Sequence, residues 1–524
     1  MINPFEPMTR SSSQDVHDPL VQRERLWSQD RALLDAVNLL ANKIRSLPHD
    51  TLCPNTEPRA LLVGGFVRDA LLGLKPKDMD VEVYGVSPER LESLLEQMYP
   101  GRVNSVGRAF GILKVALGDG LDFDVSIPRS ESKMGSGHTG FVVKGDPSMD
   151  VKEAARRRDF TINALSADPM TGEVLDLFGG VDDLVEKRLR VTDVERFQDD
   201  PLRVYRAVQF AARFGFTLES ESKQLMREMV ERGDLTELSK ERISEEIGKL
   251  LLKSPRPSIG FEQMRDLGII ERDYPELHAL IGTPQEPEWH PEGDVWIHTM
   301  MVLDAAAKIA KRESPDGSPL FTDRDRLGIL LGAVCHDLGK PATTESAEKD
   351  GVMRLRSLAH EQAGKEPTKQ LFARWKFSEE LEQTAIAIAT EHLKPGELYR
   401  QHVKGNLDAG GATNAIRKLL KRIHPTSWRV LIASSEADHR GRGLAGVDRG
   451  PYPSGEWFAE VIKKNRLDEA PTKKLLRGED LMALGMKPGR EIGEMIKAIE
   501  LLRDSGEIVT HEQAMEEARR RLAG

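Results

Sequence analysis

The sequence predicts an α+β protein in which a small mixed sheet with its helices comes first and all-helical domains follow. Between about residue 60 and residue 182, short apolar runs alternate with glycine turns and helical stretches, which is typical of a mixed α/β unit. Beyond residue 182, apolar residues recur at helical spacing between Gly and Pro breaks, and we expect helices without further strands. The 524 residues also exceed one core, since domains usually hold about 100–200 residues.

Composition excludes several classes of protein. The hydrophobic share of 39% and the charged share of 31% describe a globular chain, and no apolar run approaches membrane-spanning length. The N-terminus lacks the features of a secretory signal, so we expect a cytoplasmic protein without membrane contact. Cys53 and Cys335 are too few for a disulfide framework and are expected to be free thiols. The net charge of −10 argues against a generally basic nucleic-acid binder, although phosphate contact depends on local clusters.

A strand, a glycine turn and a helix open the mixed unit. The run ALLVGG ends in Gly64 and Gly65, and the following helix carries Arg68. Because glycine has no Cβ, the backbone can come close to a ligand, and free amides at a helix start favour phosphate. A Gly-Gly pair alone more often makes only a tight turn, so the next strand decides the interpretation.

Alternating carboxylates begin that next strand. Asp78 and Asp80 stand two residues apart in KDMDVEVYG, so on a strand both face the same side and can hold Mg²⁺ beside phosphates. In-line nucleotidyl transfer needs that arrangement. Asp124 in LDFDVSI is a candidate third carboxylate, and Asp122 on the same face is an equal rival. Solvated charges at a strand end are the alternative for both.

The sequence resembles the class II tRNA nucleotidyltransferases, the CCA-adding enzymes and bacterial poly(A) polymerases of the polymerase-β superfamily. The resemblance covers roughly residues 57–280 and rests on motifs in the family's order. These motifs are LLVGGFVRDALLG with KDMDVEVYG, RRRDFTINALS at 156–166, DLFGGVDDL at 176–184, DDPLRVYRAVQFAARFGF at 199–216 and ERISEEIGKLL at 241–251.

The resemblance implies a role for each matching residue. Asp78, Asp80 and Asp124 are the implied catalytic carboxylates, with Mg²⁺ on the first two. The implied nucleotide contacts are Gly64, Gly65, Arg68, Arg158, Asp159, Asn163, Asp200, Arg203 and Arg206. Asp199 stands where the family commonly has Glu, and a helix N-cap function of the Asp199–Asp200 pair is compatible.

Asp200 and Arg203 resemble the family's protein template for the incoming base. Arginine can donate to a ring nitrogen while aspartate accepts from an exocyclic amine, a pairing that cytosine and adenine both offer. Uracil and guanine would set donor against donor and acceptor against acceptor. The implied substrates are therefore tRNA, CTP and ATP.

The polar stretch SIPRSESKMGSGHTGF is predicted to be a flexible loop. It resembles the loop that CCA-adding members need for the final adenosine, which CC-adding relatives lack. Arg129, Glu131 and Lys133 in this stretch favour full CCA addition.

A second group of chemical residues lies in apolar helical runs. His298 and the adjacent pair His336-Asp337 lie in two such runs, and a buried carboxylate there is costly unless a metal neutralises it. With Asp438 as fourth ligand, the order resembles the metal centre of the HD phosphohydrolase superfamily, and a transition metal such as Ni²⁺, Co²⁺ or Mn²⁺ suits it. His360 and His392 could bind phosphate or a second metal, and surface or packing positions are equally compatible.

The resemblance implies a tRNA nucleotidyltransferase that adds CCA without a nucleic-acid template. The HD fusion resembles members whose HD domain hydrolyses 2′,3′-cyclic phosphates and 2′-phosphates, which implies a phosphohydrolase activity. Two alternatives stay open: a poly(A) polymerase or A-adding enzyme, and an HD phosphohydrolase with a degenerate RNA-binding head. The Asp78-x-Asp80 pair speaks against the second. The sequence predicts neither the oligomeric state nor the tail residues that contact tRNA. The predicted domains are an extension with a lead-in helix (1–56), the nucleotidyltransferase head (57–185), a helical neck (186–285), the HD domain (286–445) and a helical RNA-binding tail (446–524).

Overall fold

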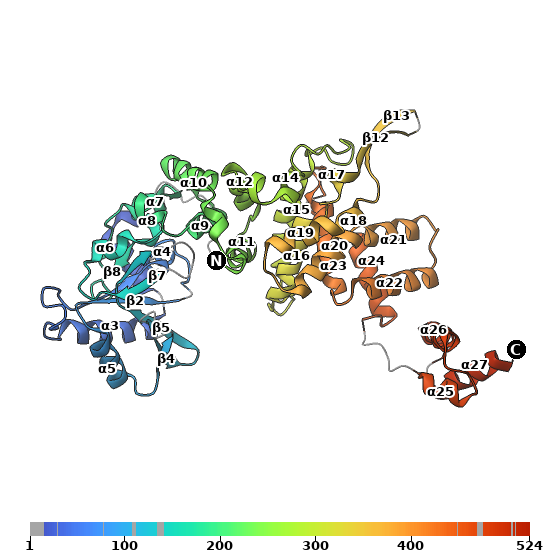
Figure 1. Ribbon diagram of the computed structural model, residues 1–524, viewed down its shortest axis with the longest axis horizontal. Coiled ribbons are helices and arrows are strands. Elements are labelled where there is room, and N and C mark those ends of the chain that lie inside the picture. The colour runs from blue at the N-terminus through green and yellow to red at the C-terminus, as the bar shows by residue number, and fades with distance from the viewer. Residues whose placement is uncertain are drawn as a thin grey trace. The chain divides into compact units, whose positions relative to one another are not determined.

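The computed structural model describes residues 15–28, 30–76, 78–106, 112–133, 141–349, 351–447, 449–468, 475–504, 507–508 and 510–523. The chain divides into two compact units, Met1–Lys394 with Arg422–Pro451 and Pro395–Lys421 with Tyr452–Gly524 (Figure 1). One boundary lies within the Gly- and Pro-rich stretch at 441–455 that composition marks as a linker. None of the described helices is long and apolar enough to cross a membrane.

The head of the first unit is built on a seven-stranded mixed sheet with the order β3-β4-β5-β2-β1-β8-β9. Its strands are β1 (Arg59–Val63), β2 (Asp80–Tyr84), β3 (Val103–Val106), β4 (Ile112–Gly118), β5 (Leu121–Ser126), β8 (Ser166–Ala167) and β9 (Val174–Leu175). The helices around it are η1 (Asp15–His17), α2 (Pro19–Trp27), α3 (Arg31–Arg45), α4 (Gly65–Leu71), α5 (Pro88–Met98), α6 (Val151–Arg156), η2 (Thr161–Asn163) and α7 (Gly180–Val185). The predicted strand, turn and helix order of the head is confirmed. The lead-in segment forms two helices, because Asp30 caps α3 through the Ala32 and Leu33 amides.

Residue alternation gives the sheet two different faces. Val81 and Val83 of β2 are fully buried in the core that also contains Val37 and Leu40 of α3. Strand geometry sends alternate side chains to opposite faces, so the residues between these valines lie on the other face. The carboxylates of β2 are thereby kept off the core.

The stretch predicted as a flexible loop is in part a hairpin. Arg129–Lys133 form β6, which pairs antiparallel with β7 (Phe141–Gly145). The polar composition of β6 hid the hairpin, because a two-stranded sheet needs backbone pairing but no apolar face. Residues 134–140 between the two strands lie outside the described residues.

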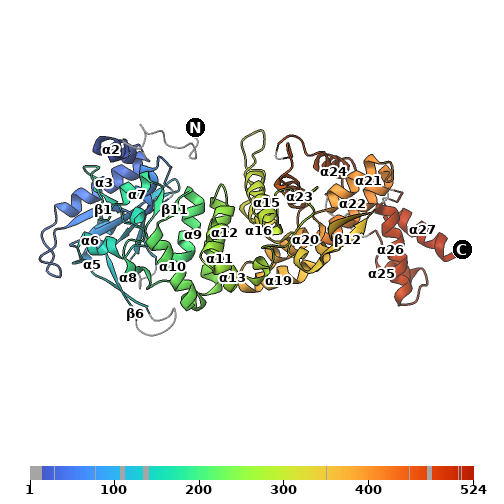
Figure 2. The same ribbon diagram turned by 90° about the horizontal axis from the view of Figure 1, so that it is seen from above.

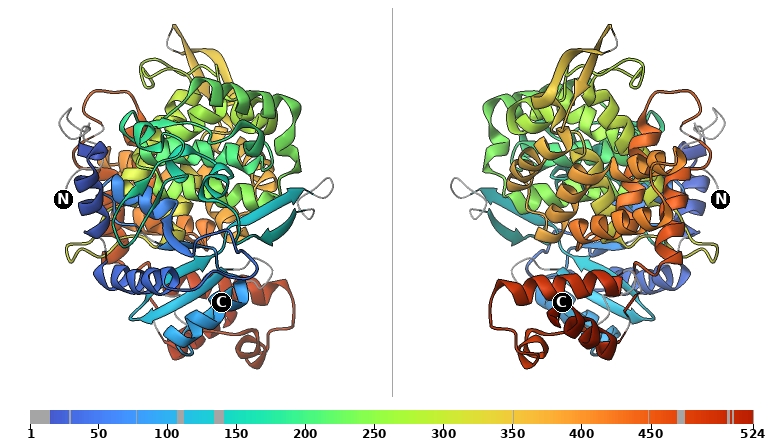
Figure 3. Two further views of the ribbon diagram at one scale, coloured as in Figure 1. Left: turned by 90° about the vertical axis from the view of Figure 1, so that its left-hand side faces the viewer. Right: turned by 90° about the vertical axis from the view of Figure 1, so that its right-hand side faces the viewer.

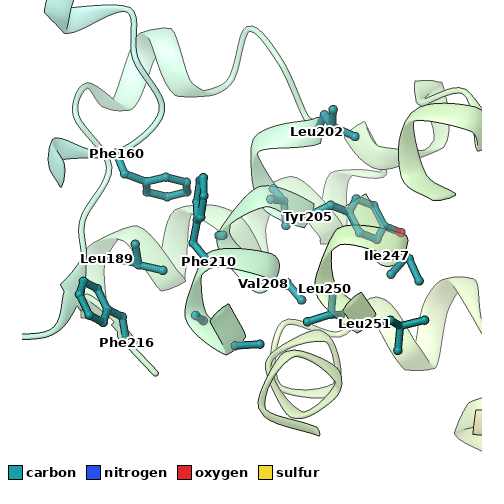
Figure 4. Close-up of a cluster of buried hydrophobic side chains, with 14 of the residues drawn as sticks. Phe160, Leu189, Leu202, Tyr205, Val208, Phe210, Phe216, Ile247, Leu250 and Leu251 are labelled. Carbon is teal, nitrogen blue, oxygen red and sulfur yellow. The ribbon is translucent and has the colours of Figure 1, made fainter. Parts of the chain in front are cut away.

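The neck helix α9 (Leu202–Phe214) packs inside a continuous core. Figure 4 shows Phe210 turned toward Phe160 of the head, with ring centroids 5.9 Å apart, and Tyr205 on the other side of the helix. The Tyr205 hydroxyl lies 3.0 Å from the Tyr274 hydroxyl. The other neck elements are α8 (Val194–Phe197), β10 (Arg188–Leu189), β11 (Thr217–Leu218), α10 (Ser220–Arg232), η3 (Asp234–Glu237), α11 (Lys240–Lys253), α12 (Ser258–Asp266), α13 (Ile269–Asp273) and α14 (Pro275–His278). In both views, α9, α11 and α12 lie between the head sheet and α16 (Figure 1, Figure 2).

Four helices form the bundle that follows the neck: α15 (Val295–Ala310), α16 (Asp323–Cys335), α20 (Glu379–Glu391) and α23 (Trp428–Gly441). Shorter elements complete it: α17 (Lys340–Thr343), α18 (His360–Ala363) and α19 (Lys365–Arg374). Gly332 allows α16 to approach α20 closely, because a Cβ there would lie 2.1 Å from Cδ1 of Ile388. Cys53 and Cys335 are free and buried, as expected.

The expectation that strands end near residue 182 is wrong in two places. The short strands β10 and β11 pair in the neck, and β12 (Thr344–Lys349) pairs with β13 (Val352–Ser357) as a hairpin. The gold hairpin projects from the body of the bundle in Figure 3. Its alternating polar and apolar residues are too few to show a core-facing pattern in the sequence.

The second unit contains the remaining helices. They are α21 (Lys394–Val403) and α22 (Ala409–Ile423), which each cross the unit boundary at one end, then α24 (Pro453–Lys464), α25 (Gly478–Ala483), α26 (Arg490–Asp504) and α27 (His511–Ala523). Leu481, Ile499 and Ala514 lie in a small core of their own within α25–α27. Trp457 stacks on His402, with ring centroids 5.0 Å apart.

Candidate functional site

The carboxylates predicted to hold magnesium lie along one face of the head sheet. Strands β2 and β5 pair in parallel, and their register sets Asp80 opposite Asp124. Neighbouring strands lie about 4.8 Å apart, and opposed side chains point to the same face. Asp78 is exposed just before β2, close enough for its charge to act on Asp80. Asp122 lies on the same face one alternation further along β5, so the register favours Asp124 as the third carboxylate.

Burial and like charge both act on Asp80. Burial raises the pKa of Asp80, and the charges of Asp124 and Asp78 add to the rise, while Arg158 opposes it. Asp124 Oδ1 is buried without a hydrogen-bond partner, and Lys114 Nζ lies 3.6 Å from it. A divalent cation would satisfy that oxygen and relieve the repulsion, so these residues fit Mg²⁺. Within the described residues, the three carboxylates do not form a set of ligand atoms all within 4.8 Å.

The glycine turn before α4 lies beside these carboxylates. Gly64 has a φ of 64°, which few side chains tolerate, and a Cβ on it would lie 2.6 Å from Nη1 of Arg158. Arg158 therefore covers the turn, and its Nη2 lies 3.7 Å from Oε2 of Glu82, the next residue on the face after Asp80. Gly65 begins α4, where the backbone amides are available. The phosphate contacts of Gly64, Gly65 and Arg158 stay predictions.

Four other predicted nucleotide contacts form a single buried network. Arg206 Nε donates to Asp159 Oδ2 at 2.7 Å, and Asn163 Nδ2 donates to Asp159 Oδ1 at 2.8 Å. Arg68 donates to Asn163 Oδ1 and, at 2.7 Å, to Asp69 Oδ1. Burial would raise the pKa of Asp159, but Arg206 and Asn163 outweigh it and hold the pKa low. Arg68 is only 4% exposed, so here its guanidinium supports the protein, and its contact with a triphosphate stays a prediction.

The two residues predicted to read the base lie at the start of α9. Arg203 donates to the backbone oxygens of Arg196 and Arg157, at 2.8 and 2.7 Å. Asp200 accepts from Arg242 at 2.9 Å, and its other oxygen accepts from the Leu202 amide at 3.2 Å. Asp200 thus contacts the first turn of α9, although the N-cap residue is Pro201 and not Asp199 or Asp200. The contact with Arg157, which also pairs with Glu82, connects Arg203 to the carboxylate face.

The residues of the predicted loop are only partly described. Arg129 begins β6, while the side chains of Glu131 and Lys133 lie outside the described residues. Their part in adenosine addition stays a prediction.

The predicted metal ligands of the bundle come together from three helices. His298 lies on α15, His336 and Asp337 at the end of α16, and Asp438 on α23. His298 Nε2 lies 3.2 Å from Asp438 Oδ1 and 3.6 Å from Asp337 Oδ2, and His336 Nε2 lies 3.1 Å from the same Asp337 oxygen. All four are buried.

His360 and His392 complete a second group beside the first. Asp337 Oδ1 lies 3.3 Å from His360 Nε2, and His360 and His392 have ring centroids 5.7 Å apart. The ligand atoms within each of two groups lie within 4.8 Å of one another. These groups are His298 with His336 and Asp438, and Asp337 with His360 and His392. Both histidines are buried, so the surface alternative for them is wrong.

The four histidine rings of these two groups share one hydrogen-bonding arrangement. In each, Nδ1 faces an acceptor outside the centre, which leaves Nε2 toward the other ligands. The acceptors are Glu292 Oε1 for His298 (2.7 Å), Ala333 O for His336 (2.8 Å), Ser357 O for His360 (2.8 Å) and Ile388 O for His392 (3.1 Å). Nε2 of His336 and of His360 is buried without a hydrogen-bond partner. This donor set fits a transition metal.

The electrostatics favour the ligand form of His392 and Asp337. Burial lowers the pKa of His392 to about 4, and the charge of His336 adds to the effect. Burial acts to raise the pKa of Asp337, but His336 and Lys340 outweigh it and lower the pKa well below its usual range. For His336, burial acts to lower the pKa, but Asp337 outweighs it and raises the pKa. A proton and a metal ion therefore compete for that ring.

The sequence alone did not single out several residues of these sites. Lys340 Nζ lies 2.7 Å from Asp337 Oδ2 and donates to Gln285 Oε1 at 2.7 Å. Its spacing of three from Asp337 on a helical segment could have indicated the contact. Arg242 carries no comparable signal, because its partner Asp200 lies 42 residues away in the sequence. Glu292 lies two residues from His290 and six from His298, but outside a helix or strand such spacings predict no contact. The stretch 283–294, which joins the neck to α15, packs against the bundle through Gln285 and Glu292.

Comparison with known families agrees with this layout. Three family models match: "Poly A polymerase head domain" at residues 60–190, "Probable RNA and SrmB- binding site of polymerase A" at 215–281, and "HD domain" at 295–424.

Similar proteins span most of the chain. A multifunctional CCA protein of Stenotrophomonas maltophilia is 38% identical, over 83% of this chain and 96% of its own length. One of Pasteurella multocida is 34% identical, over 77% of this chain and 88% of its own. The solved CCA-adding enzyme of Thermotoga maritima, complexed with tRNA, has a TM-score of 0.54 at 21% identity and covers 95% of this chain and 98% of its own. A CCA-adding enzyme with CTP gives a TM-score of 0.58 at 22% identity and covers 97% and 99%. The structural likenesses show the fold.

Replacing Asp80 by Asn is expected to raise the thermal stability of the protein. A carboxyl whose pKa is raised by folding stabilises the fold only while protonated, and this contribution is lost as the pH rises through that pKa. At pH 7 the ionised Asp80 therefore costs stability that Asn does not, and we expect Tm to rise by about 1–3 °C. Thermal unfolding across pH 4–8 measures this, and the gain should shrink toward acid pH.

Asp78→Asn is the matched control. Asp78 is exposed, so the Tm of the Asp78→Asn variant should stay at the wild-type value. If the Tm of the Asp80→Asn variant falls by several degrees, Asp80 supports the fold and is not a strained ligand.

Proposed function

This chain belongs to the multifunctional CCA protein family, and we propose that it adds C, C and A to tRNA 3′ ends from CTP and ATP. No nucleic-acid template is needed for this reaction. Beyond the family, the observation that supports the proposal is the pairing of Asp80 with Asp124 beside the turn at Gly64. That pairing offers carboxylates next to a backbone turn suited to a triphosphate.

The transfer joins the tRNA 3′ hydroxyl oxygen to the α-phosphorus of the nucleotide. The bond from that phosphorus to the bridging oxygen breaks, pyrophosphate leaves with the electron pair, and the hydroxyl proton passes to solvent. Mg²⁺ held by Asp78, Asp80 and Asp124 would stabilise the charge that develops on the phosphates. Arg158, at the turn, would orient the triphosphate.

Base choice would fall to Asp200 and Arg203. Each already makes hydrogen bonds of the kind the base requires, since Arg203 donates to carbonyl oxygens and Asp200 accepts from N–H groups. Cytosine or adenine would replace such partners with equivalent ones, whereas uracil or guanine would leave the polar groups of Asp200 and Arg203 unpaired. Family membership favours CCA addition over a poly(A) polymerase or an A-adding enzyme.

We propose a second activity for the bundle, hydrolysis of 2′,3′-cyclic phosphates and 2′-phosphates at RNA ends. His298, His336, Asp337 and Asp438 would hold a transition metal such as Ni²⁺, Co²⁺ or Mn²⁺, and Asp337, His360 and His392 would hold a second cation or the phosphate. Bound metal would supply a water-derived nucleophile near neutral pH. That oxygen bonds to phosphorus as one P–O ester bond breaks, and the freed ribose oxygen takes up a proton.

The protein is proposed to work in the cytoplasm.

The direct test uses tRNA that lacks its last three nucleotides. Incubated with CTP and ATP, the wild-type protein should lengthen this RNA by three nucleotides on a sequencing gel. An A-adding enzyme would lengthen only RNA that already ends in CC, a poly(A) polymerase would give a ladder with ATP alone, and a degenerate head would give no product.

In that assay, Arg203→Ala is expected to relax base choice. UTP and GTP incorporation should rise relative to CTP and ATP by about tenfold or more, because the donor that rejects them is lost while the phosphates are bound elsewhere. Single-nucleotide incorporation rates measure the change. Arg227→Ala, on an exposed part of α10, is the control. An unchanged preference at reduced rate would make Arg203 structural.

The two activities are expected to be separable. Asp337→Ala should abolish hydrolysis of 2′,3′-cyclic nucleotides, with any stimulation by Ni²⁺, Co²⁺ or Mn²⁺, and leave CCA addition in Mg²⁺ within about twofold of wild type. Asp316→Ala, on a surface loop of the same unit, should change neither. Metal analysis of the wild-type protein is the direct check. Absence of both bound transition metal and hydrolysis after loading would make the bundle an RNA-binding scaffold.

A further inference from the structure

We propose that Glu292 is a positioning residue of the bundle's metal centre, which fixes the His298 ring and anchors the segment behind Asp438. The proposal rests on the metal centre proposed above. Glu292 lies in the stretch 283–294 that joins the neck to α15, outside the group of predicted ligands.

One carboxylate joins three parts of the chain. Glu292 Oε1 accepts from His298 Nδ1 at 2.7 Å and from His290 Nδ1 at 2.9 Å. Glu292 Oε2 accepts from the Gly443 amide at 2.9 Å, five residues beyond Asp438. The ends of the two helices that carry His298 and Asp438 are thus held by the same side chain.

Glu292 contacts Gly443 closely, and its side chain is shielded from solvent. The Glu292 side chain is 2% exposed, and a Cβ on Gly443 would lie 2.9 Å from Glu292 Cβ. Burial would raise the pKa of Glu292, but hydrogen bonds from His290, His298 and Gly443 outweigh it and lower the pKa. A buried carboxylate with three N–H donors has little freedom to turn, so it fixes the orientation of the rings that it contacts.

His298 differs in this respect from the other three histidines of the centre. His336, His360 and His392 present Nδ1 to backbone carbonyl oxygens, whereas His298 presents it to a carboxylate. A carboxylate behind a ligating imidazole fixes its tautomer and raises its basicity, and its loss typically weakens metal binding about 10–100-fold. We therefore expect His298 to be the strongest imidazole donor of the centre.

The charges near His298 also indicate that Glu292 supports metal binding. The carboxylates Glu292, Asp337 and Asp438 lie around it, while the nearby cations are Lys340 beside Asp337 and Arg442 beside Asp438. A divalent cation reduces the repulsion among three buried carboxylates, and Glu292 contributes one of those charges from the Nδ1 side of the His298 ring, whereas Asp438 faces Nε2.

The test measures Co²⁺ binding to the metal-stripped full-length protein by calorimetry, for wild type and Glu292→Gln. Glutamine keeps the shape of glutamate but replaces one carboxylate oxygen with an NH₂ group, which cannot accept a hydrogen bond. Either His298 Nδ1 or the Gly443 amide then loses its acceptor. We expect the Co²⁺ dissociation constant to rise about 10–100-fold. The Tm gained on Co²⁺ loading should shrink, while the metal-stripped Tm changes less. Glu288→Gln, on the same segment but paired with Arg354 at the surface, should bind Co²⁺ like wild type.

Each result has one meaning. Equal Co²⁺ affinity in wild type and Glu292→Gln would overturn the positioning role and leave the metal centre standing. A wild-type protein that binds no Co²⁺ would remove the metal centre itself, and with it this proposal. If Glu292→Gln does not fold, Glu292→Asp keeps the charge but shortens the reach to His298, and it should fold and bind Co²⁺ more weakly. Failure of both variants to fold would assign Glu292 to the fold as a whole and overturn the proposal.

Discussion

The ion pair between Asp159 and Arg206 is the contact on which the nucleotide site of the head depends. Asp159 follows α6 in the head, and Arg206 lies one turn after Arg203 on α9. Through Asn163, the same aspartate connects to Arg68 in the helix behind the glycine turn. The pair therefore sets the distance between the elements proposed to hold phosphates and those proposed to read the base. A shift of α9 would therefore move the elements proposed to hold phosphates together with those proposed to read the base.

The proposed metal centre of the bundle is built differently. Its ligands come from helix ends, and each imidazole is oriented by an acceptor behind it, such as Ala333 O behind His336. The head instead uses strand register to set Asp80 against Asp124. Strand carboxylates suit a hard cation and buried imidazoles suit a transition metal, so the two proposed sites favour different cations.

The sequence predicted the elements that carry both sites, because glycine turns, strand alternation and buried His-Asp pairs leave a local pattern. It could not predict that Arg68 is turned inward onto Asn163, since that depends on a partner 95 residues away. Only one of the Glu292 contacts, with Gly443, spans 151 residues, and those with His290 and His298 start from an irregular stretch whose geometry the sequence does not predict. The hairpins β6–β7 and β12–β13 were missed because each is a two-stranded sheet of its own, which needs backbone pairing but no core-facing pattern.

A double-mutant cycle on CTP binding tests the role of Asp159 and Arg206 most directly. The CTP dissociation constants of wild type, Asp159→Asn, Arg206→Met and the double variant are measured by calorimetry. If the pair acts as a unit, each single change weakens CTP binding and the double change weakens it little further, with a coupling energy of about 1–3 kcal/mol. Losses that add to within about 0.5 kcal/mol would contradict the account, because the two residues would then act independently.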